Sequence, residues 1–262
     1  MTTELHLLSL RVVVPPLGTR GAAVECRPIV DGRDILAEVF EEGPGEDPRY
    51  LLGPKSLLHA TDTPREVRVA VAGCAEACCG AVYVTIRHDG QHVVWSGWRN
   101  PLAEEVGLPE LRFDVDQYEA EVDRAAADHS WEWPARTVAR LLEGRLREHT
   151  DWLAAWECEL GAVSAWHWDP DQITVFLFHP GRSAIREDRP WLQFRMTIPI
   201  SADDPADQVD TLEACLTAGD PREVAEVCGG SKEFADQLGY PWPGPRRHAR
   251  TAGEAGNTAR QE

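Results

Sequence analysis

Alternating apolar and polar positions between residues 81 and 98 predict a β-hairpin. The dipeptide Asp89-Gly90 lies between its two halves and is a strong short-range signal for a hairpin turn, because its residues accept a positive φ. Centring the turn on this dipeptide pairs Ile86 with Val93. One face of the hairpin is then a continuous apolar stripe, and we expect that face to lie in the core.

The first third of the chain is also predicted to be β-structure. The apolar runs Leu7–Val14 and Val24–Val30 predict strands, and the turn dipeptide Asp31-Gly32 leads into a third apolar stretch, Ile35–Phe40. Three short strands are therefore expected before residue 41.

A second antiparallel pair is predicted much later in the chain. Residues Ile173–Phe178 and Trp191–Ile200 are both rich in apolar and β-branched side chains. The loop 179–190 that joins them is long enough to carry function.

Helical periodicity marks the remaining segments. Apolar side chains spaced three and four residues apart predict one helix after Asp116 and a second that begins at Pro134. Further helices are predicted after Asp204, after Asp220, and from Ser231 to Gly239. The apolar stripes of the first three long helices are formed by Tyr118, Val122 and Ala125, by Val138, Leu141, Leu142 and Leu146, and by Val209, Leu212 and Leu216.

This order of strands, helices, strands and helices favours an α+β fold over an alternating, doubly wound sheet. We expect antiparallel β-hairpins forming a sheet, with two blocks of helices packed against it. Residues 1–242 are predicted to form one α+β domain, and 103–114 is the place where a subdivision would fall. Residues 243–262 lack apolar periodicity and are predicted to be a disordered tail.

The composition is strongly acidic, with 26 Lys and Arg against 44 Asp and Glu and a formal net charge of −18. Such a surface repels phosphates, and nonspecific nucleic-acid binding depends on basic contacts to them. We therefore expect neither nucleic acid nor an anionic membrane as a partner. A basic protein is the partner that this charge favours.

The N-terminal segment contains the acidic Glu4 and lacks the basic region of a secretory signal peptide. No run in the sequence approaches the 18 apolar residues of a membrane span. A cytoplasmic location is expected. Only Lys55 and Lys232 are lysines, and this bias towards arginine, with abundant Ala and Gly, indicates a GC-rich bacterial genome.

Carboxylates crowd the first predicted helix, and we take five of them as candidate partner-binding residues. The common alternative for such a run is a solvated helix face. The candidates are Asp114, Asp116, Glu119, Glu121 and Asp123, of which Glu119 and Asp123 are one turn apart and should share a face.

Three thiols, Cys74, Cys78 and Cys79, occur within six positions and could supply zinc ligands. Their spacing matches no standard zinc pair, and the alternative is that they are small buried hydrophobic side chains. The chain has seven cysteines, an odd number, which together with the absence of a secretion signal indicates free thiols in a reducing compartment.

The sequence His167-x-Asp169 resembles the start of a two-histidine, one-carboxylate iron site. His179 is the nearest candidate for the second histidine. The alternative interpretation is a strand end followed by a proline turn, and that pattern is much more common.

Two hypotheses for function follow. The first is a non-enzymatic, acidic interaction protein without a cofactor, such as an antidote or immunity-type partner of a basic protein. The second is a metal- or thiol-dependent enzyme, with zinc or iron as its cofactor. The P-loop, GxGxxG, GxSxG and HExxH motifs are absent from the sequence, which favours the first hypothesis.

Overall fold

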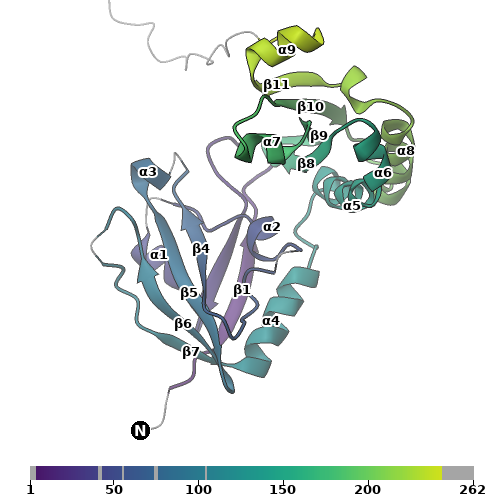
Figure 1. Cartoon of the computed structure of the whole chain (residues 1–262). Coiled ribbons are helices and arrows are strands. Elements are labelled where there is room, and N and C mark those ends of the chain that lie inside the picture. Colours follow the sequence, from purple (N-terminus) through teal and green to yellow (C-terminus); the bar gives the residue numbers. More distant parts are fainter. Residues whose placement is uncertain (1–3, 41–42, 55, 74–75, 104, 244–262) are drawn as a thin grey trace, which may run out of the picture. The chain divides into compact units, whose positions relative to one another are not determined.

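The computed structural model describes residues 4–40, 43–54, 56–73, 76–103 and 105–243. The chain divides into two compact units, one of Met1–Trp133 with Trp166–Pro170 and one of Pro134–Ala165 with Asp171–Glu262. The segment 103–114 lies inside the first unit. The predicted tail, apart from Pro243, lies outside the described residues. The α+β class is confirmed, with antiparallel sheets and two groups of helices (Figure 1).

The first unit contains two antiparallel sheets. One has the order β1-β2-β3 and the other the order β4-β5-β6-β7. The strands are β1 (Leu8–Val13), β2 (Glu25–Val30), β3 (Arg33–Asp34), β4 (Arg65–Val71), β5 (Ala81–Asp89), β6 (His92–Arg99) and β7 (Leu111–Asp114).

Backbone hydrogen bonds connect the two sheets on both sides. The Cys26 amide of β2 donates to the Glu46 carbonyl over 2.7 Å, and the Glu46 amide donates to Val69 of β4 over 2.9 Å. On the other side, the His6 amide donates to the Arg112 carbonyl of β7 over 2.8 Å. Both sheets therefore enclose one shared apolar core.

The helices of this unit are α1 (Ile35–Val39), α2 (Pro48–Leu51), α3 (Glu76–Cys79) and α4 (Val115–Ala127). The prediction that Ile35–Phe40 continues the β-structure is wrong. The Asp34 side chain accepts a hydrogen bond from the Ala37 amide over 3.1 Å and caps a short helix instead.

The hairpin of β5 and β6 exists, but its predicted register is wrong by two residues. Ile86 lies opposite Trp95, and Asp89 lies opposite His92. The turn is therefore Gly90-Gln91, with only Gly90 at a positive φ of 65°. A glycine at the first central position is sufficient for a two-residue hairpin turn. A shift of two residues keeps every side chain on its predicted face, so the core stripe is as expected.

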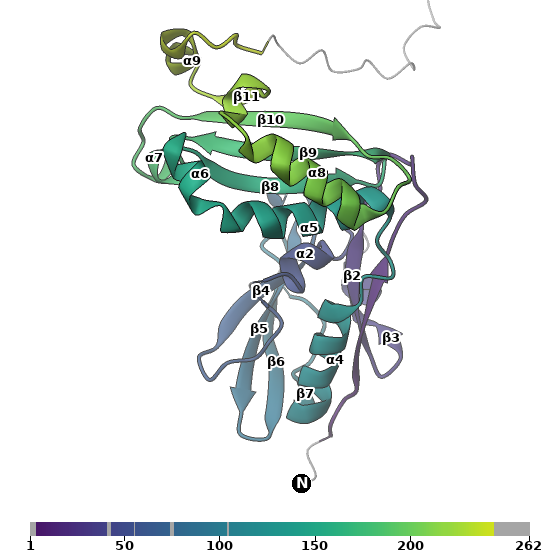
Figure 2. The same cartoon turned by 90° about the vertical axis from the view of Figure 1, so that its right-hand side faces the viewer.

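The second unit has one four-stranded antiparallel sheet in the order β11-β10-β9-β8, and its longest helices, α5 and α8, pack on each other (Figure 2). Its strands are β8 (Glu159–Trp166), β9 (Asp169–His179), β10 (Leu192–Pro199) and β11 (Glu226–Gly230). Its helices are α5 (Pro134–Glu148), α6 (Thr150–Ala155), α7 (Arg182–Arg186), α8 (Pro205–Thr217) and α9 (Lys232–Leu238).

The predicted β pair of this unit is confirmed, since Phe194 of β10 lies opposite Leu177 of β9. The prediction of a helix after Asp220 is wrong. The Asp220 side chain accepts from the Arg222 amide over 2.9 Å, but the turn that it caps is a single 3₁₀ turn, and the edge strand β11 follows directly.

Candidate functional site

The acidic helix α4 begins where β7 ends, at Asp114. The Asp114 side chain accepts a hydrogen bond from the Gln117 amide over 3.1 Å and is the N-cap of the helix. Tyr118, Val122 and Ala125 are buried, as the periodicity predicts. The remaining faces of α4 therefore determine what its carboxylates do.

One side face of α4 pairs with the edge of β1. The Leu10 amide donates to Glu121 over 2.6 Å, and Arg124 donates to the Leu10 carbonyl over 2.9 Å. Gln117 binds Leu8 in the same way, accepting from its amide over 3.3 Å and donating to its carbonyl over 2.8 Å. Side chains at helical spacing thus supply the hydrogen bonds that a neighbouring strand would otherwise make.

Glu121 consequently has a structural role within the unit, which differs from the partner-binding role predicted for it. Its side chain is only 12% exposed and pairs with Arg124 over 2.7 Å. Burial raises the pKa of the Glu121 carboxyl, but hydrogen bonds from Arg124 and Leu10 outweigh that effect and the pKa lies below its ordinary value.

Glu119 and Asp123 face the loop that precedes β4. Glu119 contacts His59 Nδ1 and accepts from the Ala60 amide over 3.2 Å, while Asp123 lies 3.4 Å from His59 Nε2. The two carboxylates contact one imidazole ring, so they share a helix face as their spacing predicts. Arg65 also holds this loop, donating to the His59 carbonyl over 2.7 Å.

The outer face of α4 consists of exposed acidic and small residues. Asp116, Ala120, Asp123 and Ala127 are all exposed, and the Asp123 side chain has 73% of its surface accessible. Of the five predicted carboxylates, Asp114 caps the helix, Glu119 and Glu121 bind within the unit, Asp116 is exposed, and Asp123 is largely exposed although it also lies 3.4 Å from His59. Below, "the outer face of α4" means these four exposed residues.

The negative charge is concentrated in the first unit. This unit has 12 Lys and Arg against 24 Asp and Glu, a formal charge of −12, and the second unit carries the other −6 of the total −18. Asp62, in the loop next to His59, is 99% exposed and adds to the charge on this side of the unit.

The thiol cluster is only partly described, because Cys74 lies outside the described residues. Cys78 is exposed and Cys79 is half-buried, with 3.6 Å between their sulfur atoms. The interpretation of these thiols as buried hydrophobic side chains is therefore wrong for Cys78. It applies instead to Cys26 and Cys158, where burial raises the thiol pKa to about 12 and about 11. Within the described segments, no group of three or more His, Cys, Asp or Glu could hold a metal ion.

His167 lies in the tight turn between β8 and β9 and is buried, whereas Asp169 is exposed. The His167 carbonyl accepts from the Gly18 amide over 2.7 Å. His179 stands at the opposite end of β9, roughly 33 Å from Asp169 at the usual strand rise. His179 therefore cannot complete an iron triad with them. A strand does end here, at Trp166, but the turn is His167-Trp168, and Pro170 already belongs to β9, so the predicted proline turn is wrong.

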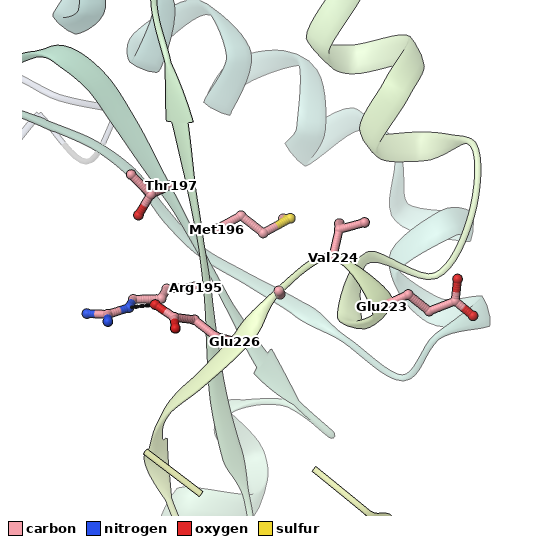
Figure 3. A pocket seen from close by; sticks show the side chains of 7 residues that line it. Arg195, Met196, Thr197, Glu223, Val224 and Glu226 are labelled. Carbon is pink, nitrogen blue, oxygen red and sulfur yellow. Dashed lines mark hydrogen bonds and ion pairs between the residues drawn. The ribbon is translucent and has the colours of Figure 1, made fainter. Parts of the chain in front are cut away.

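A shallow pocket of about 400 Å³ lies in the second unit beside the paired ends of β10 and β11 (Figure 3). Arg195 and Glu226 neutralise each other across the two strands over 2.5 Å. Glu223 points away from that pair, and Met196 and Val224 line the remainder (Figure 3). The acidic groups of this pocket diverge, so it does not assemble an acid–base pair.

The sequence analysis gave Glu121 only a partner-binding role, and it did not single out Gln117, Arg124 or His59. Gln117, Glu121 and Arg124 recur at the i, i+4, i+7 spacing of one helix face, and that signal is readable in the sequence. His59 carries no such signal, because its position beside α4 depends on how a long loop folds.

In the described part of the chain, no helix has the length and apolar character needed to cross a membrane. No protein-family model, curated protein sequence or solved structure matches the chain.

Proposed function

We propose that the chain is an acidic cytoplasmic interaction protein, of the antidote or immunity type, and that the outer face of α4 docks a basic protein partner. The division of carboxylates on α4 is the observation that carries this proposal. Glu119 and Glu121 are used within the unit, whereas Asp116 and Asp123 of the same helix are exposed, Asp123 at 73% despite its contact with His59.

The shape of this face suits a close contact. Ala120 lies one turn after Asp116, and Ala127 lies one turn after Asp123, so each carboxylate has a small exposed side chain next to it along the helix, with the exposed Arg124 at its flank. An arginine or lysine of a partner can approach each carboxylate while its backbone stays near the helix surface.

The charge of the unit supports the same partner class. A formal charge of −12 produces a negative potential that accelerates the encounter with a cationic protein and fades within about 8–10 Å at physiological salt. Exposed ion pairs each stabilise a complex only slightly, so we expect these charges to act mainly on the association rate.

The proposal is tested with two charge-reversal variants of the full chain. The α4 variant carries Asp116→Lys and Asp123→Lys, and the matched α8 variant carries Asp207→Lys and Asp210→Lys. Asp116 and Asp207 are both exposed first-turn aspartates. Asp123 and Asp210 are 73% and 68% exposed, with a basic group at 3.4 and 3.5 Å. The two variants therefore change the net charge equally.

Each protein is used to capture binding proteins from native lysate at low salt, followed by a salt step and mass spectrometry. We expect the wild type and the α8 variant to retain the same basic protein and to release it in the salt step. The α4 variant should not retain this protein. Equal retention by the two variants, or equal loss from both, would reject the outer face of α4 as the docking surface.

A further inference from the structure

His59 is held in a fixed position beside the outer face of α4. The loop that carries it is bound to α4 on both sides of the histidine. Before it, the Leu58 carbonyl accepts from the Tyr118 hydroxyl over 2.7 Å. After it, the Ala60 amide donates to the Glu119 side chain over 3.2 Å. The imidazole itself is 30% exposed, so it exchanges protons with solvent while the backbone around it stays in place.

Both nitrogen atoms of the His59 ring face a carboxylate of α4. Nδ1 contacts Glu119, and Nε2 lies 3.4 Å from Asp123. A carboxylate only accepts hydrogen bonds, and a neutral imidazole has one N–H to donate, whereas an imidazolium has two. Both contacts are therefore hydrogen bonds only when the ring is protonated.

The contact with Asp123 is the one that a neutral ring loses. Glu119 is only 31% exposed, and its other oxygen already accepts from the Ala60 amide, so this carboxylate stays beside Nδ1 in either state. The single proton of a neutral ring then lies on Nδ1, and the Nε2 lone pair faces Asp123. Two acceptors repel each other, and Asp123, whose side chain is 73% exposed, turns to solvent.

Two other charged side chains of the described residues lie close to this loop, and both are engaged elsewhere. Arg65 of β4 donates to the backbone carbonyl of His59 over 2.7 Å rather than to the ring. Asp62 lies 3.4 Å from Nδ1 of His88 in β5. A change in the charge of the His59 ring therefore acts on its contact with Asp123.

We propose that protonation of His59 regulates the docking surface: the protonated ring holds Asp123, and the neutral ring releases it to the basic partner. This inference rests on the proposed function, because it concerns the same face of α4. Histidine is the side chain that ordinarily changes charge between pH 5 and 8, so acidification weakens docking through this contact.

The expected effect on docking is moderate. Exposed ion pairs stabilise only slightly, so an arginine of the partner competes with His59 for Asp123 even in acid. The protonated ring also cancels one of the two negative charges that Asp116 and Asp123 contribute to the outer face of α4. At constant ionic strength, we expect the association rate of the captured basic protein to be about threefold lower at pH 5.5 than at pH 8.5.

The first measurement needs no partner. Long-range proton–nitrogen NMR spectra of the full chain show which ring nitrogens of His59 carry a proton, and the variant His59→Asn assigns their signals. We expect protons on both nitrogens at pH 5.5 and on Nδ1 alone at pH 8.5. A proton on Nε2 at pH 8.5 would overturn the inference, because Asp123 would then be held in both states. A ring that is still neutral at pH 5.5 would overturn it as well.

The second measurement is the association rate of the captured basic protein at the two pH values. His59→Asn is the main variant, since an asparagine amide can replace the Nδ1–H beside Glu119 but does not take up a proton. Asp123→Asn removes the other member of the pair. His88→Asn is the matched control, because His88 is 31% exposed against 30% for His59 and its Nδ1 also lies beside a carboxylate. Circular dichroism and the melting temperature check that each variant folds.

We expect the wild type and His88→Asn to associate about threefold more slowly at pH 5.5. His59→Asn should match the wild type at pH 8.5 and lose most of the pH difference, and Asp123→Asn should lose it too. A full pH difference in His59→Asn would overturn this inference and leave the proposed function intact. Retention of the basic protein by the α4 variant would instead reject the proposed function, and this inference with it, whichever ring nitrogen carries the proton.

Discussion

Tyr118 is the residue that connects the core of the first unit to the loop beside α4. The Trp95 indole donates to the Tyr118 hydroxyl over 3.0 Å, and that hydroxyl donates to the Leu58 carbonyl over 2.7 Å. All three residues are buried. Burial raises the pKa of Tyr118, which keeps the hydroxyl protonated and able to donate.

We predict that Tyr118→Phe lowers the free energy of unfolding by about 2–4 kcal/mol, because it leaves a buried indole N–H and a buried carbonyl without their partner. Chemical denaturation followed by tryptophan fluorescence measures this change. Tyr83→Phe is the control, since the Tyr83 hydroxyl binds the partly exposed Glu76, and it should cost about 1 kcal/mol or less. Equal effects of the two substitutions would show that the buried chain of hydrogen bonds is unimportant.

At the scale of single residues, the sequence predicts which side chains are buried, but it rarely predicts their hydrogen-bond partners. The buried state of Tyr118 follows from its place in the apolar stripe of α4. Its bond to Leu58 joins residues sixty positions apart, and no local pattern encodes such a pair. The same limit applies to Glu119, because no local pattern encodes its contact with the distant His59.

Helix α4 has a structural face and a solvent face, and the structural face protects the edge of β1. An uncovered edge strand pairs readily with other chains, so Gln117, Glu121 and Arg124 also act against aggregation. Because Glu121 acts here as a carboxylate, its contribution to the free energy of unfolding should depend on pH.

We predict that Glu121→Gln destabilises the protein by about 1–2 kcal/mol at pH 7, since the amide accepts from Leu10 without the charge that strengthens this bond and the one to Arg124. The folded-state pKa of Glu121 is lowered, so its stabilisation is complete above about pH 4.3 and is lost as the pH falls through the folded-state pKa. The difference between wild type and variant should therefore disappear in acid.

Urea denaturation at a series of pH values from 7 to 3 measures this difference. Glu110→Gln is the control, because Glu110 forms an ion pair with Arg112 at 44% exposure, and its effect should be close to zero throughout. If the difference in unfolding free energy between the wild type and Glu121→Gln stayed unchanged in acid, the charge of Glu121 would not be what stabilises the fold.

At the scale of elements, strong periodicity and capping residues predict helices and strands reliably. The short segments between them are predicted poorly. The helices that start at Pro134 and Pro205 follow from their stripes and proline positions. The strand β4 was not predicted, although Val67, Val69 and Val71 alternate with other residues between Pro64 and Gly73, and it pairs with β5. The register of the β5–β6 hairpin depends on whether Asp89-Gly90 or Gly90-Gln91 forms the turn. Both turns leave the same apolar side chains on the core face, so the hydrophobic pattern does not distinguish them.

At the scale of the whole molecule, acidity and the α+β class were predictable, whereas the division between Trp133 and Pro134 was not. Nothing in the composition changes there, because Pro134 is also an ordinary first residue of a helix. The concentration of charge in the first unit became visible only once that division was known. This concentration of negative charge is one reason for placing the proposed docking surface in the first unit.

The most direct measurement is the association rate of the captured basic protein with the wild type and both reversal variants, by stopped-flow fluorescence across a series of salt concentrations. We predict that the wild-type rate falls steeply with salt and that the α4 variant associates about tenfold more slowly at low salt, while its dissociation rate changes far less. The α8 variant should stay close to the wild type. Equal slowing of both variants, or a wild-type rate indifferent to salt, would contradict the account.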